Sequence, residues 1–235
     1  MAAKKVLFFD AGPIISIVMS RLIWILPELK KKFGGQFYIT PAVRRELIES
    51  PLTIKRFEFE ALQVMKLLRE GVLEVYAHVP LKKVRELQHL ANTSFHIQSQ
   101  PLDIIQTGEM ESVACALEED AAAVVMDERT LRLFIENSSE MKHLLEGRFQ
   151  KTVTADAAAI KKFSQQLQGI TIIRSIELVG LAYTLGLLDS YIPPGASGKE
   201  ILLDSVLWAT KYNGCAVTEH EIEEIKTYLL QDYSN

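Results

Sequence analysis

Two aspartates, Asp10 and Asp127, each follow an uninterrupted apolar run, residues 6–9 and 121–126. Such runs predict strands that are buried on both faces, as in a parallel sheet. The carboxyl ends of parallel strands meet at one edge, where open α/β sheets bind their ligands. We therefore expect both carboxylates at that edge. The simpler alternative for Asp10 is that it only caps the helix predicted to begin at Pro13.

Two glutamates are predicted to lie near the same edge. Glu109 falls in the first turn of a helix predicted over 107–119, which leads into the second apolar run. Glu46 follows a predicted strand over 36–40, in a helix for which Thr40 is the expected N-cap and Pro41 the first residue. Each also has an ordinary explanation, Glu109 as an anion favoured at a helix N-terminus and Glu46 as a solvated helix charge.

Glu111 competes with Glu109 for a place at this edge. Residues two apart on a helix point to different faces, so both rarely serve one site. We favour Glu109, which shares its side of the helix with Val113 and Ala116.

Four converging carboxylates would suit a hard divalent cation. Mg²⁺ and Mn²⁺ are held by carboxylates and water, and such ions can stabilise the attacking and leaving oxygens of a phosphodiester. The sequence therefore favours metal-dependent phosphodiester chemistry.

The order of four short motifs resembles the PIN domain family. These are an apolar strand ending in Asp10 with Gly12 two residues later, Pro41 five residues before Glu46, a Gly-Glu-x-Glu-x-x-x-x-Ala helix from Gly108, and Val-Val-x-Asp-Glu-Arg from Val124. The resemblance covers residues 5–188. It implies a metal-dependent ribonuclease with Asp10, Glu46, Glu109 and Asp127 as catalytic residues and ligands of Mg²⁺ or Mn²⁺.

The chain departs from that family in two respects. It is longer than the small toxin-type members, and Gly12 stands where many members have Ser or Thr, which removes a hydroxyl that could assist the site. The resemblance implies RNA as substrate and raises an antitoxin or another protein as a partner. The alternative function is a PIN-like scaffold that acts as a non-catalytic binding module in an RNA-related or toxin-antitoxin complex.

A phosphatase with Asp10 as nucleophile is a weaker alternative. That chemistry usually needs a second acid two residues later, and Gly12 occupies that position. No glycine-rich nucleotide-binding motif is present, and the five histidines lack metal-ligand spacing.

Composition limits the remaining possibilities. The chain has 235 residues and a net charge of −4, so it has no global basic character for binding nucleic acid or a membrane. RNA would need local basic groups, and Arg44, Arg45, Arg129 and Arg132 are adjacent in sequence to the proposed acids.

Two cysteines make neither a disulfide framework nor a zinc pattern, so we expect a cytoplasmic protein. The apolar stretch from Ile14 to Leu29 is interrupted by Arg21 and Pro27, so we expect no membrane span.

Strands that alternate with long helices predict an α/β fold, a three-layer sandwich with a central parallel sheet, plus a helical C-terminal extension. We expect a PIN-like nuclease domain over 1–191 with a helical insertion near 132–168, and the extension over 192–235. Residues 13–32 are predicted as one long helix and residues 92–105 as a loop. Because the long helix is apolar nearly all round, we also expect a homodimer.

Overall fold

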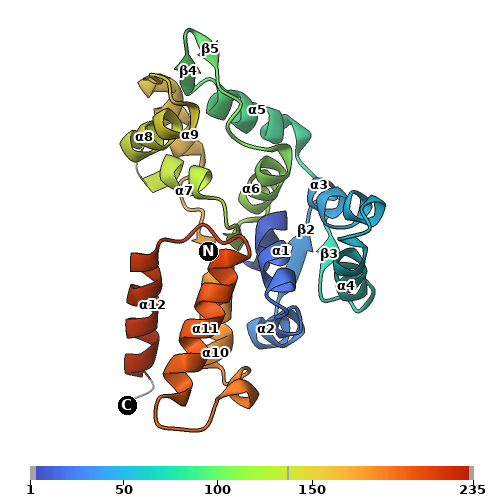
Figure 1. Ribbon diagram of the computed structural model, residues 1–235. Helices are drawn as coiled ribbons and strands as arrows, with labels where there is room; N and C mark the ends of the chain where they lie inside the picture. The colour runs from blue at the N-terminus through green and yellow to red at the C-terminus, as the bar shows by residue number, and fades with distance from the viewer. Residues whose placement is uncertain (1–3, 137, 233–235) are drawn as a thin grey trace.

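The computed structural model, described for residues 4–136 and 138–232, places a parallel sheet between two layers of helices (Figure 1). The sheet has five strands in the order β3-β2-β1-β6-β8. Their bounds are Lys4–Phe9 for β1, Gln36–Ile39 for β2, Glu74–Val75 for β3, Ala121–Val125 for β6 and Ile172–Ile173 for β8. The predicted α/β class and central parallel sheet are confirmed.

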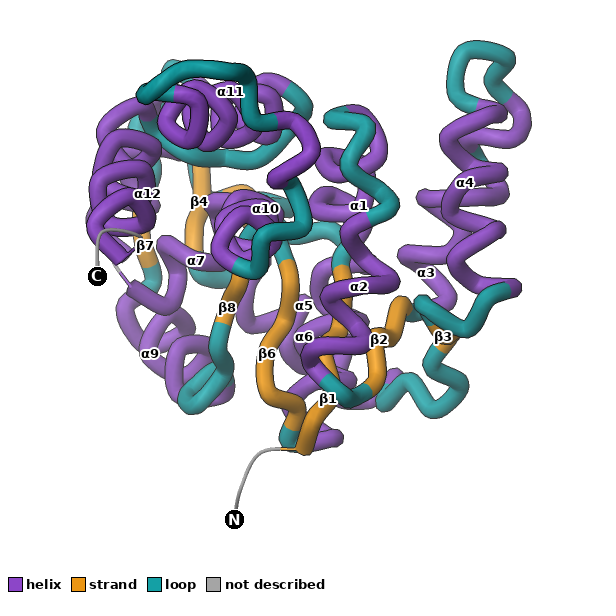
Figure 2. Tube along the Cα trace, turned by 90° about the horizontal axis from the view of Figure 1, so that it is seen from below, coloured by secondary structure: helices purple, strands orange, loops and turns teal. Residues whose placement is uncertain are grey.

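The register aligns the carboxyl end of β1 with the ends of both neighbouring strands, β2 and β6. Phe9 is aligned with Ile39 of β2 on one side and with Val125 of β6 on the other. The chain passes from β1 outward to β2 and β3, then returns to the opposite side of β1 as β6. The strand order therefore reverses between the neighbouring strands β1 and β6 (Figure 2).

Side chains of β1 alternate between two separate cores. Leu7 and Phe9 pack with one layer, made chiefly by α1 (Ala11–Met19), α2 (Ile25–Phe33), α4 (Glu58–Arg69), α10 (Ser175–Thr184), α11 (Gly198–Tyr212) and α12 (Glu219–Asp232). Val6 and Phe8 pack with the other, made by α5 (Leu81–Asn92), α6 (Thr107–Glu119), α7 (Arg129–Glu136), α8 (Ser138–Phe149) and α9 (Ala157–Gln166). This alternation is why a single apolar run can support three layers.

The predicted long helix over 13–32 is wrong, because the chain breaks it into α1 and α2. Arg21 has a left-handed backbone, with φ of 60°. The Leu22 amide donates to the Ile17 carbonyl and the Arg21 amide to the Val18 carbonyl, both at 2.9 Å, which is the Schellman pattern of a helix end. Leu22 is buried after this turn, so burial of its side chain accompanies the break.

The predicted loop over 92–105 contains a small hairpin. β4 (Phe95–Ile97) and β5 (Gln100–Pro101) are antiparallel, and β7 (Thr154–Ala155) joins them on the other side of β4. Gln98 and Ser99 both have positive φ, as a two-residue hairpin turn requires. Neither residue is a usual choice for that conformation, so the sequence did not indicate a turn here.

The helices after Pro193 pack in the helical layer that contains α1. Leu203, Leu207 and Ile222 are fully buried in the same core as Leu7 and Phe9. Thr218 and Glu221 exchange hydrogen bonds and form a capping box at the start of α12. No helix within the described residues is long and apolar enough to cross a bilayer.

Candidate functional site: a carboxylate cluster at the strand reversal

Asp10 and Asp127 lie next to each other where the strand order reverses. The Asp10 amide donates to the Val125 carbonyl at 2.9 Å, which holds the end of β1 against β6. Both aspartates are buried, at 7% and 3% exposure. Gly12 lies between them, because a Cβ there would be 3.6 Å from Asp10 Oδ2 and 3.5 Å from Asp127 Cβ. Asp10 also caps α1, because its side chain accepts from the Gly12 amide. The helix cap offered as the simpler alternative is therefore present, together with the position at the edge of the sheet.

Three donors hold the Asp127 carboxylate. Ser16 Oγ donates to Oδ2 at 2.6 Å, the Ser175 amide donates to Oδ1 at 2.7 Å, and Ser175 Oγ donates to Oδ2 at 2.7 Å. Sequence reasoning missed both serines. Ser16 lies one helical turn after Gly12, and Ser175 begins α10 directly after β8. The hydroxyls that Gly12 cannot supply are therefore supplied by Ser16, from the same helix, and by Ser175 of α10.

Glu109 is buried at the beginning of α6. Its Oε2 accepts from the Gln106 amide at 2.9 Å, which closes a capping box. Burial raises the pKa of this carboxyl to about 8, and the negative charges of Asp10, Glu128 and Glu46 add to the effect. Glu109 is therefore within electrostatic reach of the other acids, and its neutral form is favoured while no cation is present.

Glu46 approaches the same helix end from an irregular turn. α3 (Pro41–Arg44) begins with Thr40 as its N-cap, as expected, and then widens into a π-helical turn over Arg45–Glu49. A Cβ at position 108 would lie 2.8 Å from Glu46 Oε1, so Gly108 is what permits this approach. Partial burial and the charge of Glu111 raise the pKa of Glu46, and Arg45 opposes the rise. Such π-helical turns are frequent at functional sites.

Glu111 has a different structural role. Its Oε2 accepts from the Ala42 amide at 3.0 Å, so this carboxylate holds the first turn of α3. Glu111 is as buried as Glu109 and lies close enough to Glu46 to affect its pKa. It therefore fixes the segment from which Glu46 projects.

The acids influence one another across the strand reversal. Burial raises the pKa of Asp10 to about 6; the amides of Ala11 and Gly12 lower it, and the charges of Glu46 and Asp127 raise it again. The structure therefore brings Asp10 within electrostatic reach of Glu46, Glu109 and Asp127.

The donor set fits a hard cation, because it consists of carboxylate oxygens whose charges are mutually unfavourable without one. Among the described residues, no three Asp, Glu, His or Cys side chains are already placed so that they could hold one ion. Three donors from Ser16 and Ser175 already occupy acceptor positions of Asp127, and the Cys215 thiol is hydrogen-bonded to it as well, so this carboxylate has little acceptor capacity left. Binding would therefore require side-chain adjustment within the cluster.

The arginines expected near the acids are mostly engaged in ion pairs. Arg129 pairs with Glu140, Arg132 pairs with Glu221 at 3.1 Å, and Arg44 pairs with Glu49 at 3.6 Å. Arg45 is exposed beside Glu46. The basic groups available to a polyanion are thus fewer than the sequence indicates.

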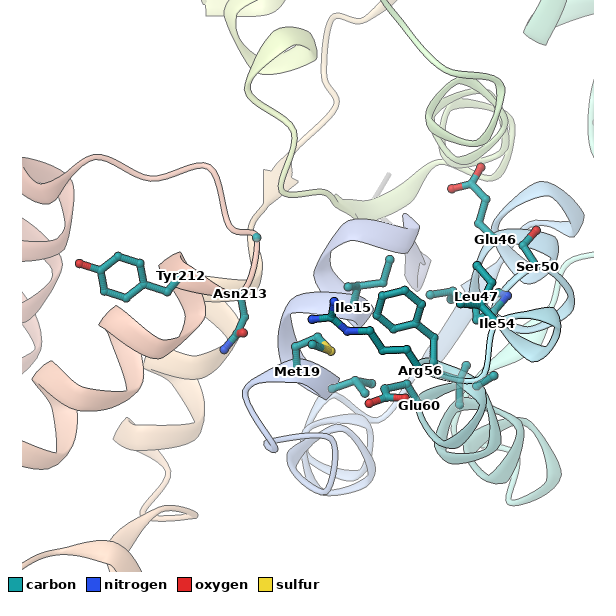
Figure 3. Close-up of a pocket in the computed structure, with 16 residues that line it drawn as sticks. Ile15, Met19, Glu46, Leu47, Ser50, Ile54, Arg56, Glu60, Tyr212 and Asn213 are labelled. Atoms are coloured by element: carbon teal, nitrogen blue, oxygen red, sulfur yellow. The ribbon is translucent and has the colours of Figure 1, made fainter.

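A cavity of about 780 Å³ extends from Glu46 along α1 and α4 (Figure 3). It was not predicted from the sequence, because its walls come from segments far apart in the chain. Glu46 lies at the end nearest α6, so the cavity opens beside the carboxylate cluster.

Comparisons with protein-family models, with curated proteins and with solved structures found no match to this chain. The functional argument therefore depends on the geometry of the carboxylate cluster and on the motif order described above.

Proposed function

We propose that the protein is an endoribonuclease that uses Mg²⁺ or Mn²⁺ to hydrolyse phosphodiester bonds. The observation that carries the proposal is the meeting of Asp10 and Asp127 at the strand reversal, with Glu46, from the π-helical turn after α3, and Glu109 of α6 within electrostatic reach of Asp10. Carboxylates whose pKa is raised by burial and by one another are typical of functional sites.

Asp10 and Asp127 would be the principal ligands, with Glu46 and Glu109 completing the set. A bound divalent cation supplies an activated water and stabilises the charge that develops on the phosphate. Ser16 and Ser175 fix the orientation of Asp127, and the Gly12 amide does the same for Asp10. Glu46 is the most exposed of the four, which suits it to orient a water molecule or accept its proton.

RNA is proposed as the substrate from the motif order that resembles PIN domains. The phosphatase alternative gains no support from the site, because the position two residues after Asp10 is Gly12, which has no side chain to act as an acid.

The test is incubation of the purified protein with end-labelled RNA and Mn²⁺, with and without EDTA, alongside Asp10→Asn. We expect cleavage that requires the metal and is lost in Asp10→Asn. Ser112→Ala serves as the matched control, since the Ser112 hydroxyl is buried without a hydrogen-bond partner among the described residues. Cleavage that persists in EDTA would refute the metal mechanism, whereas binding of RNA without any cleavage would support the scaffold alternative.

A further inference from the structure

The cavity beside Glu46 forms a continuous groove, which we call the α1–α4 groove. It is lined by Ile15, Val18, Met19, Glu46, Leu47, Ser50, Pro51, Ile54, Arg56, Phe57, Glu60, Ala61, Val64, Tyr212, Asn213 and Gly214. A volume near 780 Å³ is within the range of small-ligand sites. Because Glu46 belongs to both the groove and the carboxylate cluster, the groove begins beside the cluster, within reach of a chain bound there.

The walls of the groove are apolar yet accessible. Ile15 and Ile54 are 45% and 48% exposed, and Met19 is 37% exposed. Side chains of this kind on a monomer surface are unfavourable unless something covers them. Their arrangement suits a flat, partly apolar ligand.

One polar group inside the groove lacks a partner. Glu60 Oε2 is buried and accepts no hydrogen bond from the described residues. Figure 3 shows Glu60 beside Arg56 in the lower part of the groove, while Tyr212 points away from the other labelled side chains. A buried acceptor without a donor is costly, and Oε2 has almost no accessible surface, so the carboxylate would have to turn into the groove to meet a ligand that brings hydrogen-bond donors.

A planar surface lies close to Glu60. The Arg56 guanidinium is stacked over the Phe57 ring, 5.3 Å from its centroid. Guanidinium planes and aromatic rings are the surfaces on which proteins stack unpaired bases. The groove therefore combines a stacking surface with an acceptor-only group.

We propose that the α1–α4 groove binds a guanine base of single-stranded RNA, with Glu60 as the residue that reads it. An ionised carboxylate only accepts hydrogen bonds, and its two oxygens lie side by side. Guanine is the base whose pairing edge presents adjacent donors, the ring N–H and the amino group. Adenine, cytosine and uracil each place an acceptor beside the donor on that edge, which would face the carboxylate unfavourably.

This inference depends on the proposed function for the identity of the polymer, but its test does not require cleavage. Short uridine oligonucleotides that carry one central guanosine, inosine or adenosine are titrated in EDTA by fluorescence polarisation. Guanosine should bind about tenfold or more tightly than adenosine. Inosine keeps the ring N–H and lacks the amino group, so it should fall between them.

Glu60→Gln is the decisive variant, because an amide presents one acceptor and one donor. It should remove the preference for guanosine and move it toward adenosine. Glu58→Gln is the matched control: it lies on the same helix, pairs with Lys55 at the surface and does not line the groove, so it should keep the wild-type preference.

Equal affinity for all three oligonucleotides, or a guanosine preference unchanged in Glu60→Gln, would overturn the proposal. The two proposals fail separately. Metal-dependent cleavage without base preference would remove only the guanine site. A Glu60-dependent guanosine preference in a protein that cleaves no RNA would remove only the nuclease function.

Discussion

Ser175 donates to both oxygens of Asp127, from its amide to Oδ1 and from its hydroxyl to Oδ2, each at 2.7 Å. Because Ser175 is the first residue of α10, the helix that follows β8 fixes the carboxylate at the end of β6. The orientation of one acid thus depends on the position of a helix 48 residues later in the chain.

Ser175→Ala should lower both stability and hydrolysis. Hydrogen bonds to charged groups contribute about 1.5–3 kcal/mol, so we expect a loss of that order in urea unfolding. Ser112→Ala removes an equally buried hydroxyl that has no partner, and it should change stability far less. Equal losses in the two variants would show that the contact with Asp127 contributes nothing specific.

Asp10→Asn should abolish hydrolysis while leaving the metal-free protein at least as stable as the wild type. Burial and the charges of Glu46 and Asp127 disfavour the ionised form of Asp10, and the amide removes that cost. Thermal unfolding in EDTA measures the second effect. An active Asp10→Asn protein would exclude Asp10 as a ligand.

Glu109→Gln should reduce hydrolysis more than Glu111→Gln. Glu109 interacts with Asp10 and Glu46, whereas Glu111 accepts from the Ala42 amide, a bond that a glutamine oxygen can preserve. Initial cleavage rates at saturating Mn²⁺ make the comparison. If Glu111→Gln were the more damaging change, the assignment of the two glutamates would be reversed.

The metal-free protein should lose stability as the pH rises from about 5 to 8. The pKa values of Asp10 and Glu109 are raised to about 6 and about 8, so the folded protein keeps protons that the unfolded chain has released. Protons therefore favour the folded state in this interval, and their loss favours unfolding. Urea midpoints across this pH range test the slope.

Mn²⁺ should reverse that pH trend, because it competes with protons for the same carboxylates. Its affinity, measured by calorimetry, should increase over the same interval. The double variant Asp10→Asn with Glu109→Gln is the control, and it should show neither the slope nor the metal effect. A wild-type stability that does not respond to pH would contradict the raised pKa values.

Leu207→Ala should destabilise the protein by about 2–5 kcal/mol, the usual cost of truncating a buried leucine. Leu207 is fully buried in the core that also contains Leu7 and Phe9. Ile201→Ala on the same helix is the control, since Ile201 is 50% exposed.

Truncation at Tyr191 removes α11 and α12, whose buried side chains belong to the core, so it should expose core side chains and lower solubility. A soluble, cooperatively folding truncation would show that α11 and α12 are dispensable to the core.

The sequence predicted the parts of the site that depend on local pattern. Continuous apolar runs identified β1 and β6, and the positions of Asp10 and Asp127 follow from where those runs end. Thr40 and Pro41 likewise marked the beginning of α3. Each of these signals lies within a few residues of the feature that it predicts.

The parts that could not be predicted depend on contacts between distant segments. Ser16 and Ser175 reach Asp127 across 111 and 48 residues, and no local pattern marks either as a partner. The position of the Glu46 carboxylate depends on the space left by Gly108 in another helix. Arg21 ends α1 in a left-handed conformation that glycine usually adopts, so the residue type at this position did not indicate the break between α1 and α2. The homodimer argued from one long helix stays a prediction, and Ile15, Met19 and Trp24 are the apolar residues of that segment left exposed.

The packing of the last two helices also has a consequence for how the chain folds as it is made. Asn213 donates to Ser20 across 193 residues, and the Ala216 amide donates to the Asp127 carbonyl. Contacts of such long range form late, because the intervening chain must first be ordered. A nascent chain leaving the ribosome would thus present β1, α1 and β6 well before the segment that completes their surroundings. The carboxylates at the strand reversal would reach their final arrangement only near the end of synthesis.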